Sequence, residues 1–171
     1  MKFTLFILLV TNISCFAQNK AYKALAKLNY NSVSLYYFNC DTNSNLIKYD
    51  LLCDTSLVDS KGKWAYTVSD TNHRLSLPEV ASVIEIIKRY HLDFTSSDPV
   101  ACYTPRMGIV FYNGKLPLAH IDICLECSKV MIETFDKGKI KFRESPVSIG
   151  TKTATFFKSL CLKYGLKGCR I

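Results

Sequence analysis

The sequence predicts an α+β domain in which two main helices pack on one face of an antiparallel sheet. Two segments have a helical spacing of apolar residues, and a series of strand-like segments joined by turn signals lies between them. Further strand-like segments precede the first of these helices. This order favours a β-meander of hairpins, with the helices gathered on one side of the sheet. The chain also has eight cysteines, so the domain is capable of forming disulfides in an oxidising compartment.

The N-terminus has the pattern of a secretory signal peptide. Residues 1–17 contain one positive charge, a short apolar run and a small residue at Ala17. We expect cleavage after Ala17, which leaves a single domain over residues 18–171 in the periplasm or outside the cell. A form anchored to lipid through Cys15 is the alternative, because Ile13-Ser14-Cys15 resembles the end of a bacterial lipobox.

The chain is basic, with a formal net charge of +8. Such a charge attracts anionic partners over long distances. In the expected compartment the partner would be an anionic envelope surface or another protein, and we expect no nucleic acid. The same charge can also serve solubility alone.

Three segments are expected to be helical. A short helix is expected over residues 20–28. A longer one follows Ser76, which has Glu79 at capping-box spacing, and ends near Tyr90. The last helix is expected over residues 151–164.

Strands are expected where β-branched and aromatic residues gather between turn signals. The expected strands cover residues 32–39, 46–53, 64–69, 107–112, 116–124, 130–135 and 140–142. Asn113-Gly114 is a strong hairpin signal, and the polar residues 136–139 predict a second hairpin.

The first of these hairpins is expected to have one apolar and one polar face. With a three-residue loop at 113–115, the apolar face carries Met107, Ile109, Phe111, Ala119, Ile121 and Ile123. The polar face carries His120, Asp122, Cys124 and, beyond the strand, Glu126. In this register Arg106 falls opposite Asp122. We therefore take Arg106, His120, Asp122 and Glu126 as a candidate polar cluster.

The cysteines are best explained as structural. In the same register Cys102 lies near Cys124, and a slip of one residue would bring it closer to Cys127. We therefore expect a disulfide from Cys102 to one of these two residues. A second bridge, from Cys161 to Cys169, is expected because glycines allow the C-terminal tail to fold back over the last helix.

Two chemical alternatives remain open for the same residues. A metal site would bind zinc through Cys102, Cys124 and Cys127, with His120, His73 or His91 as the fourth ligand, although strong zinc patterns contain a second Cys-x-x-Cys pair. A redox site would use Cys124 and Cys127 as a thiol–disulfide couple. Such couples normally lie at the N-terminus of a helix, whereas this pair precedes a strand-like segment.

Three short segments carry a resemblance to known proteins. They are Cys102-Tyr103-Thr104-Pro105-Arg106, Ile123-Cys124-Leu125-Glu126-Cys127 and Leu75-Ser76-Leu77-Pro78-Glu79. Together they resemble a group of mostly bacterial exported proteins that share a cysteine followed by Pro-Arg-His, a short hairpin and Ile-Cys-Phe-Glu-Cys. Met107 stands here in place of the histidine. The group has no known activity, so the resemblance implies an architecture and not a reaction.

No motif in the sequence specifies a reaction. The three histidines are not at ligand spacing, and neither a nucleophile elbow nor a glycine-rich phosphate loop is present. We therefore expect a secreted or periplasmic, non-enzymatic binding or structural domain that is stabilised by disulfides. The alternative is the metal-binding or thiol-redox protein described above.

Overall fold

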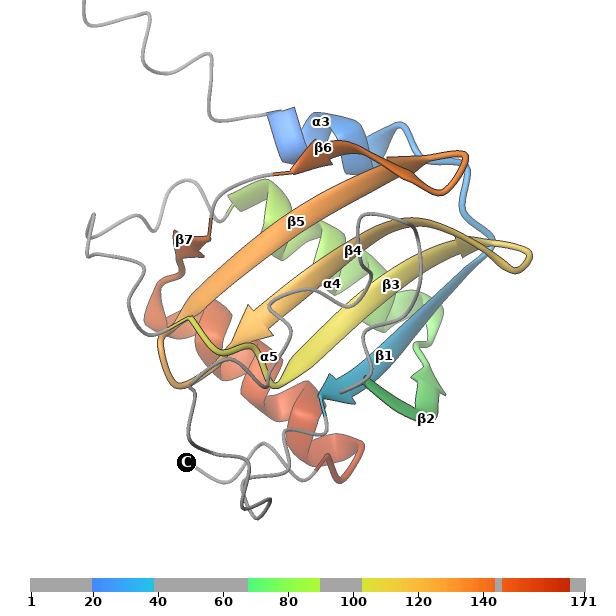
Figure 1. Cartoon of the computed structure of the whole chain (residues 1–171). Coiled ribbons are helices and arrows are strands. Elements are labelled where there is room, and N and C mark those ends of the chain that lie inside the picture. Colours follow the sequence, from blue (N-terminus) through green and yellow to red (C-terminus); the bar gives the residue numbers. More distant parts are fainter. Residues whose placement is uncertain (1–19, 39–67, 90–102, 144–145, 167–171) are drawn as a thin grey trace, which may run out of the picture.

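The computed structural model describes residues 20–38, 68–89, 103–143 and 146–166. It confirms the predicted α+β class. Within these residues a 7-stranded antiparallel sheet has α4 (Leu77–Arg89) and α5 (Thr151–Lys163) on the same face (Figure 1). A third helix, α3 (Lys20–Ala26), precedes the first strand.

The strands follow one another through the sheet in the order β2-β1-β3-β4-β5-β6, and β7 pairs with β5. They are β1 (Ser32–Phe38), β2 (Val68–Arg74), β3 (Met107–Asn113), β4 (Leu116–Cys124), β5 (Lys129–Asp136), β6 (Lys139–Arg143) and β7 (Val147–Ser148). Of the expected strands, 46–53 lies outside the described residues. The one expected over 64–69 overlaps β2, which continues to Arg74.

The main core lies between the sheet and the two longer helices. Leu35, Ile109, Ile121 and Ile132 are paired in turn across four neighbouring strands and are all fully buried. They pack in one cluster with residues of both helices. The helical members of this cluster are Val80, Val83 and Ile87 from α4 and Phe157, Leu160 and Cys161 from α5. Complete burial of an aliphatic side chain contributes about 1.5–3 kcal/mol, so this layer is a major source of stability.

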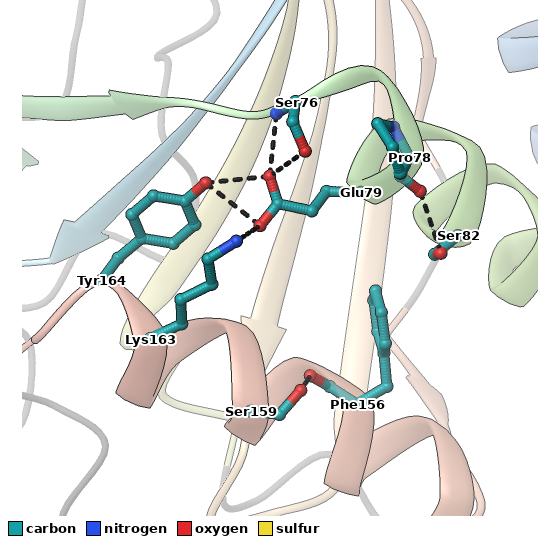
Figure 2. A network of polar contacts seen from close by, with 8 residues as sticks. All are labelled: Ser76, Pro78, Glu79, Ser82, Phe156, Ser159, Lys163 and Tyr164. Atoms are coloured by element: carbon teal, nitrogen blue, oxygen red, sulfur yellow. Dashed lines mark hydrogen bonds and ion pairs between the residues drawn. The ribbon is translucent and has the colours of Figure 1, made fainter.

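The Glu79 half of the predicted capping box at the start of α4 is present. The backbone N–H of Ser76 donates to Glu79 Oε2 at 2.8 Å, and the Ser76 hydroxyl donates to the same oxygen at 2.6 Å. Glu79 also accepts hydrogen bonds from Lys163 Nζ at 2.6 Å and from the Tyr164 hydroxyl at 2.9 Å (Figure 2). One carboxylate therefore joins the first turn of α4 to the end of α5.

The β3–β4 hairpin confirms the expected faces but corrects the expected register. Met107 pairs with Ile123 and Phe111 with Ala119, whereas Asn113 pairs with Leu116 across a two-residue turn. An irregularity between Phe111 and Tyr112 explains why the pairing near the turn is offset from the pairing farther along the hairpin. Between Met107 and Phe111 the register is therefore shifted by two residues from the expected one, which leaves the apolar and polar residues named above on their predicted faces.

This shift changes the pairing of Arg106. Asp122 lies opposite Gly108, so the expected pairing of Arg106 with Asp122 is wrong. Arg106 instead forms an ion pair with Glu126, with 3.5 Å between Nε and Oε1. Its backbone N–H donates to the Ile123 carbonyl oxygen at 3.1 Å, which holds the residue at the end of the strand pair.

Candidate functional site

The face of the sheet opposite α4 and α5 carries most of the buried polar groups of the described chain. His120, Asp122 and Glu133 are 0% exposed. They project from this face because they alternate along β4 and β5 with the core residues Ile121, Ile123 and Ile132, which face the helices. Burial of three ionisable side chains is costly unless they are paired.

These charges are paired with one another and with Arg143 of β6. His120 Nδ1 lies 3.4 Å from Asp122 Oδ1, and His120 Nε2 is hydrogen-bonded to Glu133 Oε2. The other carboxylate oxygen of Glu133 accepts a hydrogen bond from Arg143 Nε. We call His120, Asp122, Glu133 and Arg143 the buried charge cluster. With the histidine protonated, it contains two positive and two negative charges.

The cluster sets the protonation of its members. Burial alone would lower the pKa of His120, but the nearby carboxylates of Asp122 and Glu133 outweigh this effect and raise the pKa to about 9. Burial would raise the pKa of Glu133, yet its bonds to His120 and Arg143 hold that pKa below its ordinary value. His120 is therefore an imidazolium at neutral pH, able to donate from both ring nitrogens.

The structure brings together only part of the predicted polar cluster. His120 and Asp122 lie two residues apart on β4, whereas Arg106 and Glu126 form a separate, partly exposed pair just beyond the end of that strand. The sequence prediction missed Glu133 and Arg143. The available signal for Glu133 was a carboxylate directly after the apolar run 130–132 of an expected strand.

The Cys-x-x-Cys pair lies at the turn between β4 and β5. Cys124 is buried at the end of β4 and packs with Tyr103 and Met131, and Cys127 is half-buried beside them. The pair is followed by strand β5 and not by a helix. Cys102 lies outside the described residues, so its disulfide to either cysteine stays a prediction.

The alternative zinc ligands are not all brought together. His120 and Cys124 are four residues apart on one strand, which corresponds to roughly 13 Å, too far for two ligands of one zinc ion. Both ring nitrogens of His120 also face carboxylates. The described ranges contain no group of three or more His, Cys, Asp or Glu side chains placed to hold a metal ion. A site built on the cysteines alone would include Cys102, which is not described.

The C-terminal pair is placed in part. Cys161 is buried on the core side of α5, where it belongs to the main core. Cys169 lies outside the described residues, so the bridge between them also stays a prediction.

The second feature of this face is a pocket beside the tip of the β3–β4 hairpin. It is a shallow, largely open hollow with a volume of about 470 Å³. We call it the hairpin pocket. Its described lining consists of Ser32, Ser34, Tyr36, Asn72, Tyr112, Gly114, Lys115 and Pro117.

Strand pairing and side-chain hydrogen bonds organise the hairpin pocket. Ser32 pairs with Tyr112, and Tyr36 pairs with Asn72, so three adjacent strands contribute to one wall. The two phenol oxygens of Tyr36 and Tyr112 are hydrogen-bonded at 2.7 Å. Burial, and next the bond to Tyr36, raise the pKa of Tyr112, so this phenol is neutral over the physiological range.

Asn31 fixes the hairpin tip at the rim of the pocket. Its side-chain oxygen accepts a hydrogen bond from the Gly114 N–H at 3.1 Å, and its own N–H donates to the Tyr112 carbonyl at 2.8 Å. Gly114 has a φ of 60°, a left-handed conformation that glycine adopts without strain. Lys115, the next residue, is therefore carried on a well-anchored turn.

The sequence prediction did not find this pocket, although the strand contains a signal for it. Residues 32–37 alternate between polar Ser32, Ser34 and Tyr36 on one side and Val33 and Leu35 on the other. Period-two alternation of this kind indicates a strand whose second face is polar. Which other residues join that face could not be read from the strand alone.

No protein-family model, curated protein or solved structure matches the chain. In the described part of the chain, no helix has both the length and the apolar character needed to cross a bilayer.

Proposed function

We propose that the protein is an exported, non-enzymatic binding domain and that the hairpin pocket is its binding site. One observation carries the proposal: a pocket of about 470 Å³ is lined by residues of strands β1, β2, β3 and β4 and of the hairpin turn, and their side chains are mainly hydroxyl, amide and phenol groups. Groups of this kind orient a polar ligand through directional hydrogen bonds.

The rigidity of the pocket supports a binding role. Ser34 and Tyr36 are only 9% and 8% exposed, so the sheet and their neighbours hold these side chains in place. Tyr36 packs with Val110 and Phe135 in a small cluster on the same face of the sheet as the pocket. A preorganised site loses little conformational entropy when a ligand binds.

The buried charge cluster is better suited to structure than to chemistry. His120, Asp122 and Glu133 are fully buried, and both ring nitrogens of His120 are engaged by carboxylates. The raised pKa keeps the histidine protonated at neutral pH, so it does not supply a general base there. The cluster links β4, β5 and β6 beside the pocket-bearing part of the sheet.

Export is the second part of the proposal, and it is supported by the signal-like residues 1–17. Intact mass of the protein recovered from outside the cytoplasm tests it. We expect a mature N-terminus at Gln18, or its cyclised form. A diacylglyceryl mass on Cys15 would establish the lipid-anchored form, and an uncleaved Met1 in the cytoplasm would refute export.

Binding is tested by titrating the mature protein with a panel of neutral and acidic saccharides and following backbone amide signals by NMR. We expect a subset of the panel to shift the signals of Ser34, Gly114 and Lys115. Tyr112→Phe removes one pocket hydroxyl and should weaken that binding roughly three- to tenfold, the effect of one hydrogen bond. Tyr30→Phe is the matched control, because Tyr30 packs against Phe111 on the helix side of the sheet. Shifts confined to other parts of the protein, or none with any saccharide, would refute the proposal.

A further inference from the structure

We infer that the hairpin pocket is selective for an acidic saccharide, and that Lys115 recognises its carboxylate. This inference rests on the proposed function, because it names the ligand class of the same pocket. Three features of the pocket lead to it: the charge of its described lining, the chemistry of its hydroxyl and amide groups, and the anchoring of the hairpin tip.

The charge of the lining favours an anionic ligand. Lys115 is the charged member of the described lining at neutral pH, and no described carboxylate accompanies it. Arg74 adds a second positive charge nearby, because its guanidinium donates to the Asn31 carbonyl at 3.4 Å and Asn31 holds the hairpin tip. A cationic ligand would meet this positive charge without a described counter-charge, whereas a carboxylate would complement it.

The uncharged groups of the lining favour a polyol as the rest of the ligand. Ser32, Ser34 and Asn72 can each donate and accept hydrogen bonds. Sugar hydroxyls also both donate and accept hydrogen bonds, so these three side chains can bind them in several orientations. The aromatic rings of Tyr36 and Tyr112 and the ring of Pro117 supply the smaller apolar surface that the C–H faces of a sugar ring require.

The position of Lys115 makes its charge specific to the pocket. Two hydrogen bonds of the Asn31 side chain hold the turn that carries Lys115. The Asn31 side-chain oxygen accepts from the Gly114 N–H, and the Asn31 side-chain N–H donates to the Asn113 side-chain oxygen at 3.4 Å. A flexible ammonium on a fixed turn can reach a ligand at the rim while its charge stays next to the serine and tyrosine wall. The net charge of +8 would also attract acidic polymers of a cell envelope toward the protein.

The test compares two sugars that differ at one carbon. Methyl β-D-glucuronide carries a carboxylate where methyl β-D-glucoside carries a hydroxymethyl group. Both are titrated into the mature protein and into Lys115→Gln, Lys115→Arg and Lys158→Gln, with amide NMR as the readout. Lys158→Gln is the matched control, because Lys158 is exposed on α5 and its loss changes the net charge equally.

We expect the glucuronide to bind the parent protein roughly fivefold more tightly than the glucoside, the upper effect of an exposed ion pair. Lys115→Gln should abolish this preference, whereas Lys115→Arg and Lys158→Gln should retain it. The preference should also fall with added salt, since exposed charges are screened. A hyaluronan tetrasaccharide, which contains the same acid, is titrated in parallel. Its affinity is compared with that of methyl β-D-glucuronide, to distinguish a polymeric from a monomeric source of the ligand.

The possible failures are distinct. Equal affinity for the two methyl glycosides, or a preference that survives in Lys115→Gln, would overturn the acidic-saccharide inference and leave the binding site in place. Failure of every saccharide to shift Ser34, Gly114 and Lys115 in the folded parent protein would overturn both the inference and the proposed function.

Discussion

His120 on β4 and Glu133 on β5 lie directly opposite each other in the sheet, and their fully buried side chains are hydrogen-bonded. Direct cross-strand neighbours have Cβ atoms about 5 Å apart, so the contact follows from the strand register itself. The pair therefore reports on whether β4 and β5 keep their alignment. Removal of either charge of this pair would also leave the other charge buried without its partner.

We expect Glu133→Gln to lower the free energy of unfolding by about 3–5 kcal/mol, the cost of breaking a buried ion pair from one side. The imidazolium of His120 and the guanidinium of Arg143 would both lose their shared carboxylate. Urea unfolding of the parent and the variant measures the change. Glu126→Gln is the control, since its partly exposed pair with Arg106 should contribute only about 0–1 kcal/mol. Equal effects of the two substitutions would contradict the buried-pair account.

Stability should fall in the alkaline range because of His120. Its pKa is raised to about 9 in the folded protein, against about 6.5 in an unfolded chain. The stabilisation from the charged ring is therefore fully present below about pH 6.5 and is lost as the pH rises through about 9. A shift of this size corresponds to about 3 kcal/mol. Unfolding curves at about pH 6 and about pH 9 measure it. His73→Gln should keep this dependence, and His120→Gln should flatten it.

The sequence was sufficient for the layers of the fold because each element repeats its own signal. The alternation of Ile109 and Phe111 with Val110 defines two faces of β3 without any knowledge of its partners. Ser76 and Glu79 likewise mark the start of α4 within a single turn. Such local patterns determine which side of an element is buried.

Contacts between distant segments were not predictable in the same way. The pairing of Arg106 depends on the size of the turn at Gly114 and on an irregularity beside Phe111. Together these shift the register of Met107 to Phe111 by two residues, which keeps their side chains on the predicted faces. Glu133 joins His120 only because β5 pairs with β4 in one particular alignment. The hairpin pocket likewise needs three strands and a turn to be placed together.

The carboxylate of Glu79 should matter more for stability than that of Glu85, the other carboxylate of α4. Glu79→Gln removes the charge that Lys163 and Ser76 bind, and we expect a loss of about 1–2 kcal/mol, typical of a lost cap with charge-assisted bonds. Glu85→Gln on the same helix breaks only exposed pairs with Arg89 and, at 4.0 Å, Lys88, and should cost about 0.3–0.5 kcal/mol. Thermal unfolding of the two variants makes the comparison.

Glu79 should also make the stability of the protein depend on pH in the acid range. Burial alone would raise the pKa of Glu79, but the bonds from Lys163 and Ser76 lower it to about 2 from 4.5. Its stabilisation is present above about pH 4.5 and is lost as the pH falls toward about 2. The parent should therefore lose stability over this interval more steeply than Glu79→Gln. Parallel curves for the two proteins would show that the network contributes nothing.

The C-terminal cysteines are expected to be bonded to each other. Cys161 is buried on α5, and Gly165 directly after this helix has a φ of 64°, which turns the chain at that point. Peptide mapping of the mature protein without reductant should recover Cys161 joined to Cys169. Alkylation of both residues in the unreduced protein would refute this bridge.

Cys102 is expected to be oxidised to Cys124 or Cys127, which lie together at the β4–β5 turn. The bond would close a loop of about 20–25 residues, for which chain entropy predicts a stabilisation of roughly 3 kcal/mol. Cys102→Ser should therefore lower the melting temperature by about 6–12 °C, and a reductant should have a similar effect on the parent protein. Peptide mapping identifies which of the two cysteines is bonded, and metal analysis of the same sample tests the alternative. One equivalent of zinc, with three thiols that react only after chelation, would replace the disulfide with a metal site at this turn.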